Sequence, residues 1–385
     1  MIPRCKEYAQ AARASGRPVV GIMCEYAPRE VVLAAGAVPV CLCGGDPDTI
    51  PSAETRLPTN LCPLIKSTYG YWVEHGNPFL EMADFVLAET TCDGKKKMFE
   101  LLGETKPTFL LELPHRDNAP DAREQWVREL ARLRDFLATR YRVEVDDARL
   151  RAAVRTMNRE RGLRRRLADL MKREAPPLTG RQLLDLKSII SGIPADLDQY
   201  ERALKLLAQA DGAAEPGAAR GGRPRVLLTG VPLVHGAERV LEIIESSGGL
   251  VVCQENCTGL KPILEDVPEN ASDLLGALAD KYFHLPCSVR TPNDGRFQTL
   301  RQLTAEFRAE CVIELIWQAC LTYAIEADRT RRLVEEELKL PYLRIETDYS
   351  PSDSARIATR VEALLEMVSD RRGERAPRGT GGNAA

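Results

Sequence analysis

Two blocks of alternating strand and helix patterns restrict the fold of this chain more than any other feature. The first block begins at 19–44, with a β-branched strand, a turn at Pro28, a helical apolar spacing and a second strand. A buried strand within 83–94, a helix at 95–104 and a strand at 107–114 follow. Strands that alternate with helices predict a parallel sheet with helices on both faces.

The second block repeats this pattern after a long interruption. Strands are predicted within 225–230, 250–259, 310–320 and 341–348, and helices at 237–249, 326–339 and 354–368. The chain has 385 residues, more than the ~100–200 that one domain usually contains. We therefore predict an α/β fold with two Rossmann-like doubly wound parallel-sheet domains and additional helices.

The segment between the blocks contains long charged helix patterns at 122–141 and 148–171, and a stretch rich in Ala, Gly and Pro at 211–225. These patterns predict the domain boundaries. We expect an N-terminal α/β domain (1–120), a helical segment and linker (121–222), a C-terminal α/β domain (223–370) and a disordered tail (371–385).

Composition excludes several classes of partner. The net charge is only −3 and the sequence has no basic footprint for phosphate backbones, so nucleic acid is not expected. No stretch approaches the ~20 apolar residues of a membrane span, and the N-terminus lacks the apolar core of a signal peptide. A cytoplasmic protein is expected. No GxxxxGK[ST] loop occurs, so nucleotide hydrolysis by a P-loop is not expected.

Eleven cysteines are many for a reducing compartment, where clustered thiols bind metal or do redox chemistry more often than they form disulfides. Four of them are interpreted as small buried hydrophobes: Cys5, Cys41, Cys253 and Cys311. The others lie at or just after predicted strand ends, or in loops: Cys24, Cys43, Cys62, Cys92, Cys257, Cys287 and Cys320. Ligands bind at the carboxyl ends of parallel strands, so this placement favours a shared site.

The spacing of these cysteines does not suit zinc, because no CxxC pair is present and the histidines (His75, His115, His235 and His284) are scattered; each histidine is interpreted as structural. Iron–sulfur clusters can take thiolates from separate loops. Cys92 begins a predicted helix, whose dipole favours a thiolate. Glu346, Asp348 and Asp353 surround a strand end, where capping and loop bonding are favoured over acid–base catalysis.

The chain resembles the 2-hydroxyacyl-CoA dehydratase and benzoyl-CoA reductase superfamily, and within it the double-cubane cluster proteins. The resemblance is carried by EYAPREVVLAAGAVPVCLC, LPTNLCPLIKSTYG, ETTCDGKKKMFELL, CQENCTG, LPCSVRTPNDGR, IWQACLTYAIEA and LPYLRIETDYSPSDSARIATRVEALLEM. These segments span nearly the whole chain, and CDGKKKM and IETDYS are the most specific.

The resemblance implies a set of cluster ligands. Cys62, Cys92 and Cys320 match the loops that hold one four-iron cluster in the superfamily. The double-cubane branch needs six thiolates, and Cys24, Cys257 and Cys287 occupy the matching extra positions, with Cys43 as a reserve. Relatives often carry a further cysteine where this chain has Val289. The implied cofactor is a double cubane (8Fe–9S), with a single 4Fe–4S cluster as the alternative.

The resemblance also implies an iron–sulfur oxidoreductase. An ATP-hydrolysing iron–sulfur activator protein would supply low-potential electrons, which the cluster would deliver to a small-molecule substrate, and the chain would form a homodimer. Two alternatives remain open: a 2-hydroxyacyl-CoA dehydratase subunit with a single cluster, and a non-catalytic electron carrier. Lys95, Lys96 and Lys97 could offset cluster charge, contact the activator or solvate a helix, and solvation is expected for at least one.

Overall fold

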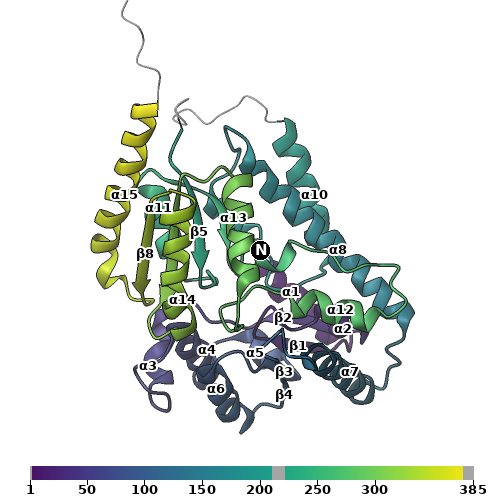
Figure 1. Cartoon of the computed structure of the whole chain (residues 1–385). Helices are drawn as coiled ribbons and strands as arrows, with labels where there is room; N and C mark the ends of the chain where they lie inside the picture. The colour runs from purple at the N-terminus through teal and green to yellow at the C-terminus, as the bar shows by residue number, and fades with distance from the viewer. Residues whose placement is uncertain (1, 210–221, 376–385) are drawn as a thin grey trace, which may run out of the picture.

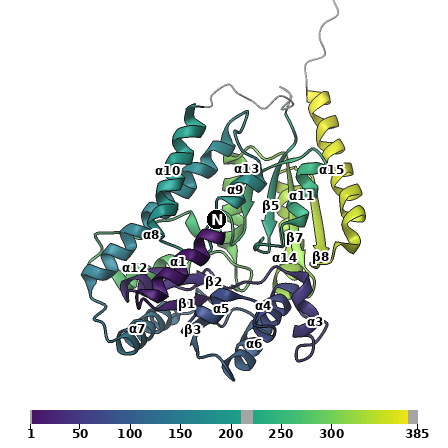
Figure 2. The same cartoon turned by 180° about the vertical axis from the view of Figure 1, so that it is seen from behind.

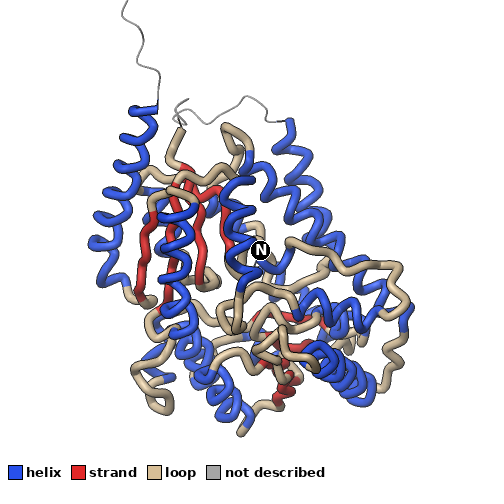
Figure 3. The backbone as a smooth tube through the Cα atoms, in the orientation of Figure 1, coloured by secondary structure: helices blue, strands red, loops and turns tan. Residues whose placement is uncertain are grey.

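A computed structural model of the chain describes residues 2–209 and 222–375 and contains two parallel four-stranded sheets. The sheets stand out as two separate groups of strands in Figure 3. The strands of the N-terminal sheet are β1 (Val19–Ile22), β2 (Val38–Cys41), β3 (Phe85–Glu89) and β4 (Thr108–Leu111). Those of the C-terminal sheet are β5 (Arg225–Gly230), β6 (Leu250–Glu255), β7 (Cys311–Trp317) and β8 (Tyr342–Thr347). The predicted α/β fold is confirmed.

Both sheets have the same strand order, β2-β1-β3-β4 and β6-β5-β7-β8. Every pairing is parallel, with Val20 opposite Phe85 in one sheet and Val226 opposite Cys311 in the other. In each sheet the direction of winding reverses beside the first strand, between β1 and β3 and between β5 and β7. Such a reversal opens a crevice at the carboxyl ends of the strands, where doubly wound proteins bind ligands.

Helices cover both faces of each sheet because successive strand residues point to opposite faces. In β3, Phe85 and Leu87 belong to one hydrophobic cluster, whereas Val86 and Ala88 belong to another. The helices around the N-terminal sheet are α1 (Ile2–Ala14), α2 (Arg29–Ala34), α3 (Ile50–Ala53), α4 (Pro63–Val73), α5 (Pro78–Met82), α6 (Asp93–Gly103) and α7 (Ala122–Tyr141).

The C-terminal sheet is covered in the same way. Figure 1 shows α13 (Asp294–Glu306) and α14 (Leu321–Arg332) in front of it, and Figure 2 shows α11 (Arg239–Ser246) on the other side. Helix α15 (Ser354–Arg375) packs on α11 and β8. Helix α14 begins at Leu321, directly after its N-cap residue Cys320 and earlier than the predicted start at 326.

The predicted helical segment connects the two halves of the molecule. It contains α8 (Asp147–Asp169), α9 (Gly180–Asp185) and α10 (Pro194–Gln209). Helix α8 packs on α2 of the N-terminal half, whereas α9 packs on β6 of the C-terminal half. Helix α12 (Leu274–Phe283) follows β6 in sequence but packs on α7 and α8. The chain therefore returns to the N-terminal half just before Cys287.

Close backbone contacts join the two halves near the strand ends. The buried hydroxyl of Tyr349 donates to the carbonyl oxygen of Gly44, 3.1 Å away. A Cβ atom at Gly45 would collide with the carbonyl oxygen of His235, so only glycine allows this approach. The loops at the carboxyl ends of the two sheets therefore contact each other.

The predicted tail needs a correction at its start. Helix α15 continues to Arg375, so residues 371–375 are helical and not disordered. The rest of the predicted tail (376–385) and most of the predicted linker (210–221) lie outside the described residues.

Candidate metal centre

Five of the candidate cysteines follow the carboxyl ends of strands, as predicted. Cys24 follows β1, Cys43 follows β2, Cys92 follows β3, Cys257 follows β6 and Cys320 follows β7. Of the two remaining candidates, Cys62 precedes α4 and Cys287 lies in the loop between α12 and α13. By contrast, Cys5, Cys253 and Cys311 are buried within helices or strands, as expected of small hydrophobes. Cys41 is less buried and ends β2.

Three of these cysteines form what we call the first thiol group: Cys62, Cys92 and Cys320. Each is the N-cap residue of a helix, of α4, α6 and α14 respectively. Burial raises the pKa of the Cys320 thiol, and the nearby Cys62 and Cys92 raise it further. Burial also raises the pKa of Cys62 to about 11, although backbone N–H groups of Ile65 and Leu64 oppose this. Helix N-termini therefore point at sulfur in this group.

The second thiol group consists of Cys24, Cys257 and Cys287. Burial raises the pKa of Cys24 well above its usual value; Lys95 opposes this shift, and Cys257 and Cys287 add to it. Burial likewise raises the pKa of Cys257 to about 12, with Lys261 opposing and Cys287 adding. Mutual electrostatic coupling of this kind requires the three thiols to lie near one another.

The loop that carries Cys287 is held against the N-terminal half. The amide of Thr291 donates to the carbonyl oxygen of His115, 2.9 Å away, and Nη1 of Arg290 donates to that of Pro114 at 2.8 Å. Nε2 of His115 in turn lies 2.9 Å from the carbonyl oxygen of Thr90, just before Cys92. His115 is thus structural, as predicted, and it links the loops of the two thiol groups.

Cys43 lies beside Cys24 of the second thiol group. Its thiol donates to the carbonyl oxygen of Met23 at 3.2 Å, next to Cys24. Cys41 forms a hydrogen bond that raises the pKa of Cys43, and burial adds to the shift. This placement keeps Cys43 available as the reserve thiol that the sequence predicts.

Arg290 is a buried cation without a carboxylate partner among the described residues. Its side chain is packed against the rings of Tyr26 and Phe283, at 5.6 and 4.3 Å from the ring centres. Arg290 is 4% exposed, and its Nε and Nη2 have no hydrogen-bond acceptor in the described part of the chain. Burying an unpaired guanidinium is unfavourable, so an anion beside Cys287 would stabilise this arrangement.

Two further buried N–H donors near the candidate ligands also have no acceptor within the described ranges. They are Nδ2 of Asn256, adjacent to Cys257, and Nε1 of Trp317, three residues before Cys320. Sulfides and thiolates of an iron–sulfur cluster accept such N–H bonds, and these bonds raise the reduction potential. The donor set therefore fits an anionic sulfur-rich group.

Within residues 2–209 and 222–375, no three cysteine, histidine or acidic side chains lie close enough together to hold a single metal ion. Thiolates of a cluster bind different iron atoms, so this requirement does not apply to them.

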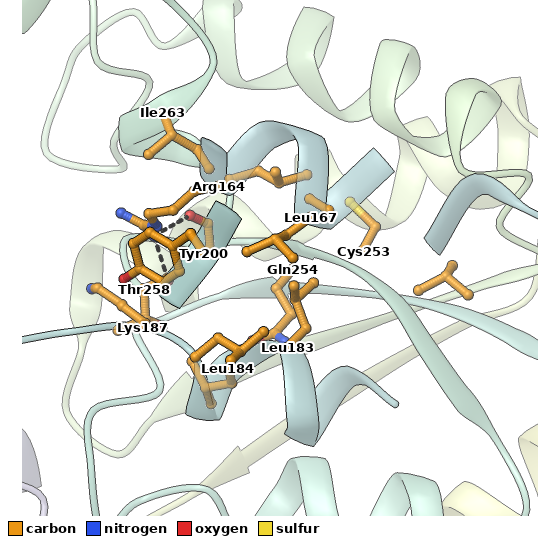
Figure 4. Close-up of a pocket in the computed structure, with 15 residues that line it drawn as sticks. Arg164, Leu167, Leu183, Leu184, Lys187, Tyr200, Cys253, Gln254, Thr258 and Ile263 are labelled. Atoms are coloured by element: carbon orange, nitrogen blue, oxygen red, sulfur yellow. Dashed lines mark hydrogen bonds between the residues drawn. The ribbon is translucent and has the colours of Figure 1, made fainter. Parts of the chain in front are cut away.

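A cavity of about 40 Å³ lies nearby, between α8, α9 and the loop after β6, and is lined by Arg164, Lys187 and Gln254 (Figure 4). It has room for a few water molecules only and is too small for a substrate.

The acidic residues at the end of β8 have structural partners. The two carboxylate oxygens of Asp353 accept from Arg239 and Thr347 at 2.8 Å, and Asp348 accepts from the amide of Ser350. Glu346 pairs with Arg344 at 2.6 Å. The interpretation of Asp348 and Asp353 as loop-bonding groups is confirmed, whereas Glu346 forms an exposed ion pair within β8.

Comparison with known proteins gives the family. The model of the family described as "2-hydroxyglutaryl-CoA dehydratase, D-component" matches residues 24–368 of the chain. The chain belongs to this family. Its membership gives it an enzyme-associated role and confirms the superfamily that the sequence motifs indicate. The part of the chain that the structure describes contains no helix that is long and apolar enough to cross a membrane.

Three relatives match most of the chain. A protein of Escherichia coli (strain K12), provisionally named dehydratase subunit YjiM, is 40% identical over 356 residues. The (R)-phenyllactyl-CoA dehydratase beta subunit of Clostridium sporogenes is 22% identical over 370 residues. The lactoyl-CoA dehydratase subunit beta of Anaerotignum propionicum is 24% identical over 359 residues. In each case 92% of both chains is covered.

Sequence reasoning missed three charged residues of the site: Arg290, Glu89 and Lys261. Arg290 lies in the same loop as Cys287, so its proximity to a candidate ligand was a usable signal. Glu89 is fully buried at the end of β3, and both of its carboxylate oxygens lack hydrogen-bond donors among the described residues. Burial raises the pKa of Glu89 to about 7, although Lys95 and Arg29 oppose the shift. Its position after an apolar strand was the only sign of this environment.

Proposed function

We propose that the two thiol groups together hold a double-cubane iron–sulfur cluster (8Fe–9S), with three thiolates for each cubane. The observation that supports this proposal is that six cysteines from six separate loops interact electrostatically as two groups of three. The buried Arg290, which has no carboxylate partner among the described residues, supports an anionic occupant. Three thiolates for each cubane also match the chemistry of cysteine-held clusters.

The residues around the cysteines would prepare them to bind metal. Burial raises the pKa values of Cys24, Cys62, Cys257 and Cys320, so these thiols keep their protons until a metal displaces them. Lys95 and Lys261 oppose this effect and would favour the thiolate forms. When bound, the cluster would store electrons at low potential.

In this proposal the chain is an iron–sulfur oxidoreductase that passes low-potential electrons to a small molecule. The electrons come from an ATP-hydrolysing iron–sulfur activator protein, as the family resemblance implies, and the lack of a P-loop motif in this chain agrees with ATP hydrolysis on another protein. The protein acts in the cytoplasm as a homodimer. The homodimer is what the family resemblance implies, whereas the beta-subunit names of two relatives favour assembly with a different partner chain.

A second candidate is a dehydratase subunit with a single 4Fe–4S cluster in the first thiol group. The family description and the names of the relatives favour it, since these proteins are named for removing water, which is a lyase reaction and not a net reduction. It leaves the second thiol group without a function. The two candidates therefore differ in the amount of iron that each chain binds.

Anaerobic purification followed by iron and sulfide analysis separates the candidates. About eight irons per chain supports the double cubane and about four supports the single cluster. A chain without iron would overturn both. Turnover of a small molecule in the presence of ATP and the activator would then distinguish an enzyme from an electron carrier.

Two matched serine variants test the ligand assignment. Cys257→Ser removes a member of the second thiol group and should lose about half or all of the iron. Cys253→Ser is the control, because Cys253 lies in the same strand and loop region but is buried in an apolar cluster. Equal iron contents in the two variants would exclude Cys257 as a ligand.

A further inference from the structure

Three consecutive lysines begin α6, and the helix directs them to different surroundings because successive residues are about 100° apart. Lys96 forms an ion pair with Asp93 at 2.7 Å, and Lys97 pairs with Glu100. Lys95 turns inward, and its Nζ donates to the carbonyl oxygen of Met23 at 3.0 Å. Only Lys95 of the three therefore reaches the candidate metal centre.

Lys95 connects the loops of the two thiol groups. It lies three residues after Cys92 of the first group, on the helix that Cys92 caps. The carbonyl oxygen that it contacts belongs to the residue just before Cys24 of the second group. The side chain also lies over the ring of Phe99, with Nζ 5.6 Å from the ring centre, which fixes its direction.

The charge of Lys95 acts on both groups. Its ammonium interacts electrostatically with Cys24 of the second group and with Cys62 and Cys92 of the first. Burial alone would lower the pKa of Lys95, but Cys24, Glu89, Cys43 and Cys92 raise it, and the net shift is upward. Lys95 is consequently an ammonium ion between the thiols. In the described residues no carboxylate lies within ion-pair distance of its Nζ, although the unpaired Glu89 is near.

Lys261 and Arg290, two cations that are more deeply buried than Lys95, each serve one group only. Lys261 acts on Cys257 and Cys287, and its Nζ is already held by Glu255 and Tyr323 at 3.1 and 3.0 Å. Arg290 lies beside Cys287 and is anchored to the carbonyl oxygen of Pro114. Lys95 differs because it reaches members of both trios and because its ammonium has a single hydrogen-bond acceptor in the described structure.

We propose that Lys95 is the internal countercharge shared by both thiol groups, and that its positive charge raises the reduction potential of the centre they hold. This inference rests on the proposed cluster. Reduction adds an electron to a group that is already anionic, and a cation in surroundings of low dielectric constant stabilises the reduced form more than the oxidised one. Removing the charge should make the centre harder to reduce.

The test compares reduction potentials of anaerobically purified, iron-loaded protein, measured by titration with a low-potential chemical reductant and electron paramagnetic resonance. Lys95→Met and Lys95→Gln remove the charge, and the glutamine keeps an amide donor for the Met23 carbonyl. Lys95→Arg keeps the charge. Lys97→Met is the matched control, because it removes one charge from the same helix at a side chain that is 74% exposed.

The neutral variants should shift the reduction equilibrium at least tenfold toward the oxidised form, which is about 59 mV for a one-electron step. Lys95→Arg and Lys97→Met should stay near the wild-type potential. If the neutral variants lose iron and the arginine variant retains it, the positive charge at position 95 is required for cluster assembly, which also supports the proposal. An unchanged potential in iron-replete Lys95→Gln, or loss of iron from the arginine variant as well, would overturn the proposal. A wild-type chain that binds no iron would instead refute the proposed function itself.

Discussion

Breaking the buried ion pair of Arg161 and Glu30 should be among the most destabilising single changes in this fold. Nη1 of Arg161 on α8 lies 2.8 Å from Oε1 of Glu30 on α2, and the two side chains are 3% and 0% exposed. The hydroxyl of Tyr282 on α12 donates to the other oxygen of Glu30 at 2.7 Å. These contacts attach α12, and with it the loop of Cys287, to the N-terminal half.

Arg161→Met leaves the Glu30 carboxylate buried with the Tyr282 hydroxyl as its remaining side-chain partner. Removing one member of a buried pair costs about 3–5 kcal/mol, because the other charge stays uncompensated. Arg159→Met on the same helix is the control: Arg159 is 47% exposed and pairs with Glu201 at 2.9 Å, and such pairs contribute about 0.2–1 kcal/mol. Urea unfolding of the two iron-free variants should therefore differ by at least about 2 kcal/mol.

A double variant provides the decisive comparison. Arg161→Met combined with Glu30→Gln removes both charges, and a neutral amide is cheaper to bury than a carboxylate. The double variant should be more stable than Arg161→Met alone. The reasoning is refuted if Arg161→Met lies within 1 kcal/mol of Arg159→Met, or if adding Glu30→Gln destabilises it further.

The same pair has a pH signature. Burial raises the pKa of Glu30, but Arg161 and the Tyr282 hydroxyl lower it more, so the folded-state pKa lies below the usual value. A carboxyl with a lowered pKa stabilises the fold above its unfolded pKa, and this contribution is lost as the pH falls through the folded value. The stability difference between wild type and Arg161→Met should shrink over that acidic range.

Two other changes can be tested by the same unfolding assay, and a third by iron analysis. Gly45→Ala should lower the free energy of unfolding by about 1–3 kcal/mol, because its Cβ meets the His235 carbonyl. Gly295→Ala, whose Cβ meets nothing within 4 Å, should raise it by about 0.5–1 kcal/mol. Equal effects of the two variants would refute the close contact. Lys281 is buried and its pKa is lowered to about 8, so Lys281→Met should stabilise the chain by up to about 3 kcal/mol at pH 7. The wild-type chain should recover this deficit in unfolding free energy as the pH rises from about 8 to about 10.5. A stability difference that does not change with pH would contradict the lowered pKa. Arg290→Met should lower the iron content after anaerobic purification, because it removes the buried cation beside Cys287; an unchanged iron content would show that Arg290 needs no anion.

The sheets were predictable because their signal is local. Apolar runs such as 225–230 and 250–255, each followed by a helical spacing, contain the information for one strand and its crossover helix. The path of α12 was not predictable in this way. It depends on the contact of Tyr282 with Glu30, residues that are 252 positions apart, and nothing near either residue indicates the other.

In the candidate site, too, local features were predictable from the sequence and long-range contacts were not. The sequence placed Cys92 at a helix start, and the structure agrees. Its assignment to a trio with Cys62 and Cys320 came from the family resemblance, since spacing cannot show which loops converge. The choice among Lys95, Lys96 and Lys97 needed the phase of α6 relative to β1, which is set by the packing of Met98 and Phe99 in the core and not by the lysines.

Each thiol group takes members from both halves of the molecule. The first group combines Cys62 and Cys92 of the N-terminal half with Cys320 of the C-terminal half, and the second combines Cys24 with Cys257 and Cys287. Neither half alone contains a complete trio, so both groups require the contacts that join the halves, such as that of Tyr349 with Gly44. A movement that separated the halves would break both groups at once. A centre built in this way cannot form before the whole chain has folded, and once bound it would in turn stabilise the contact between the halves.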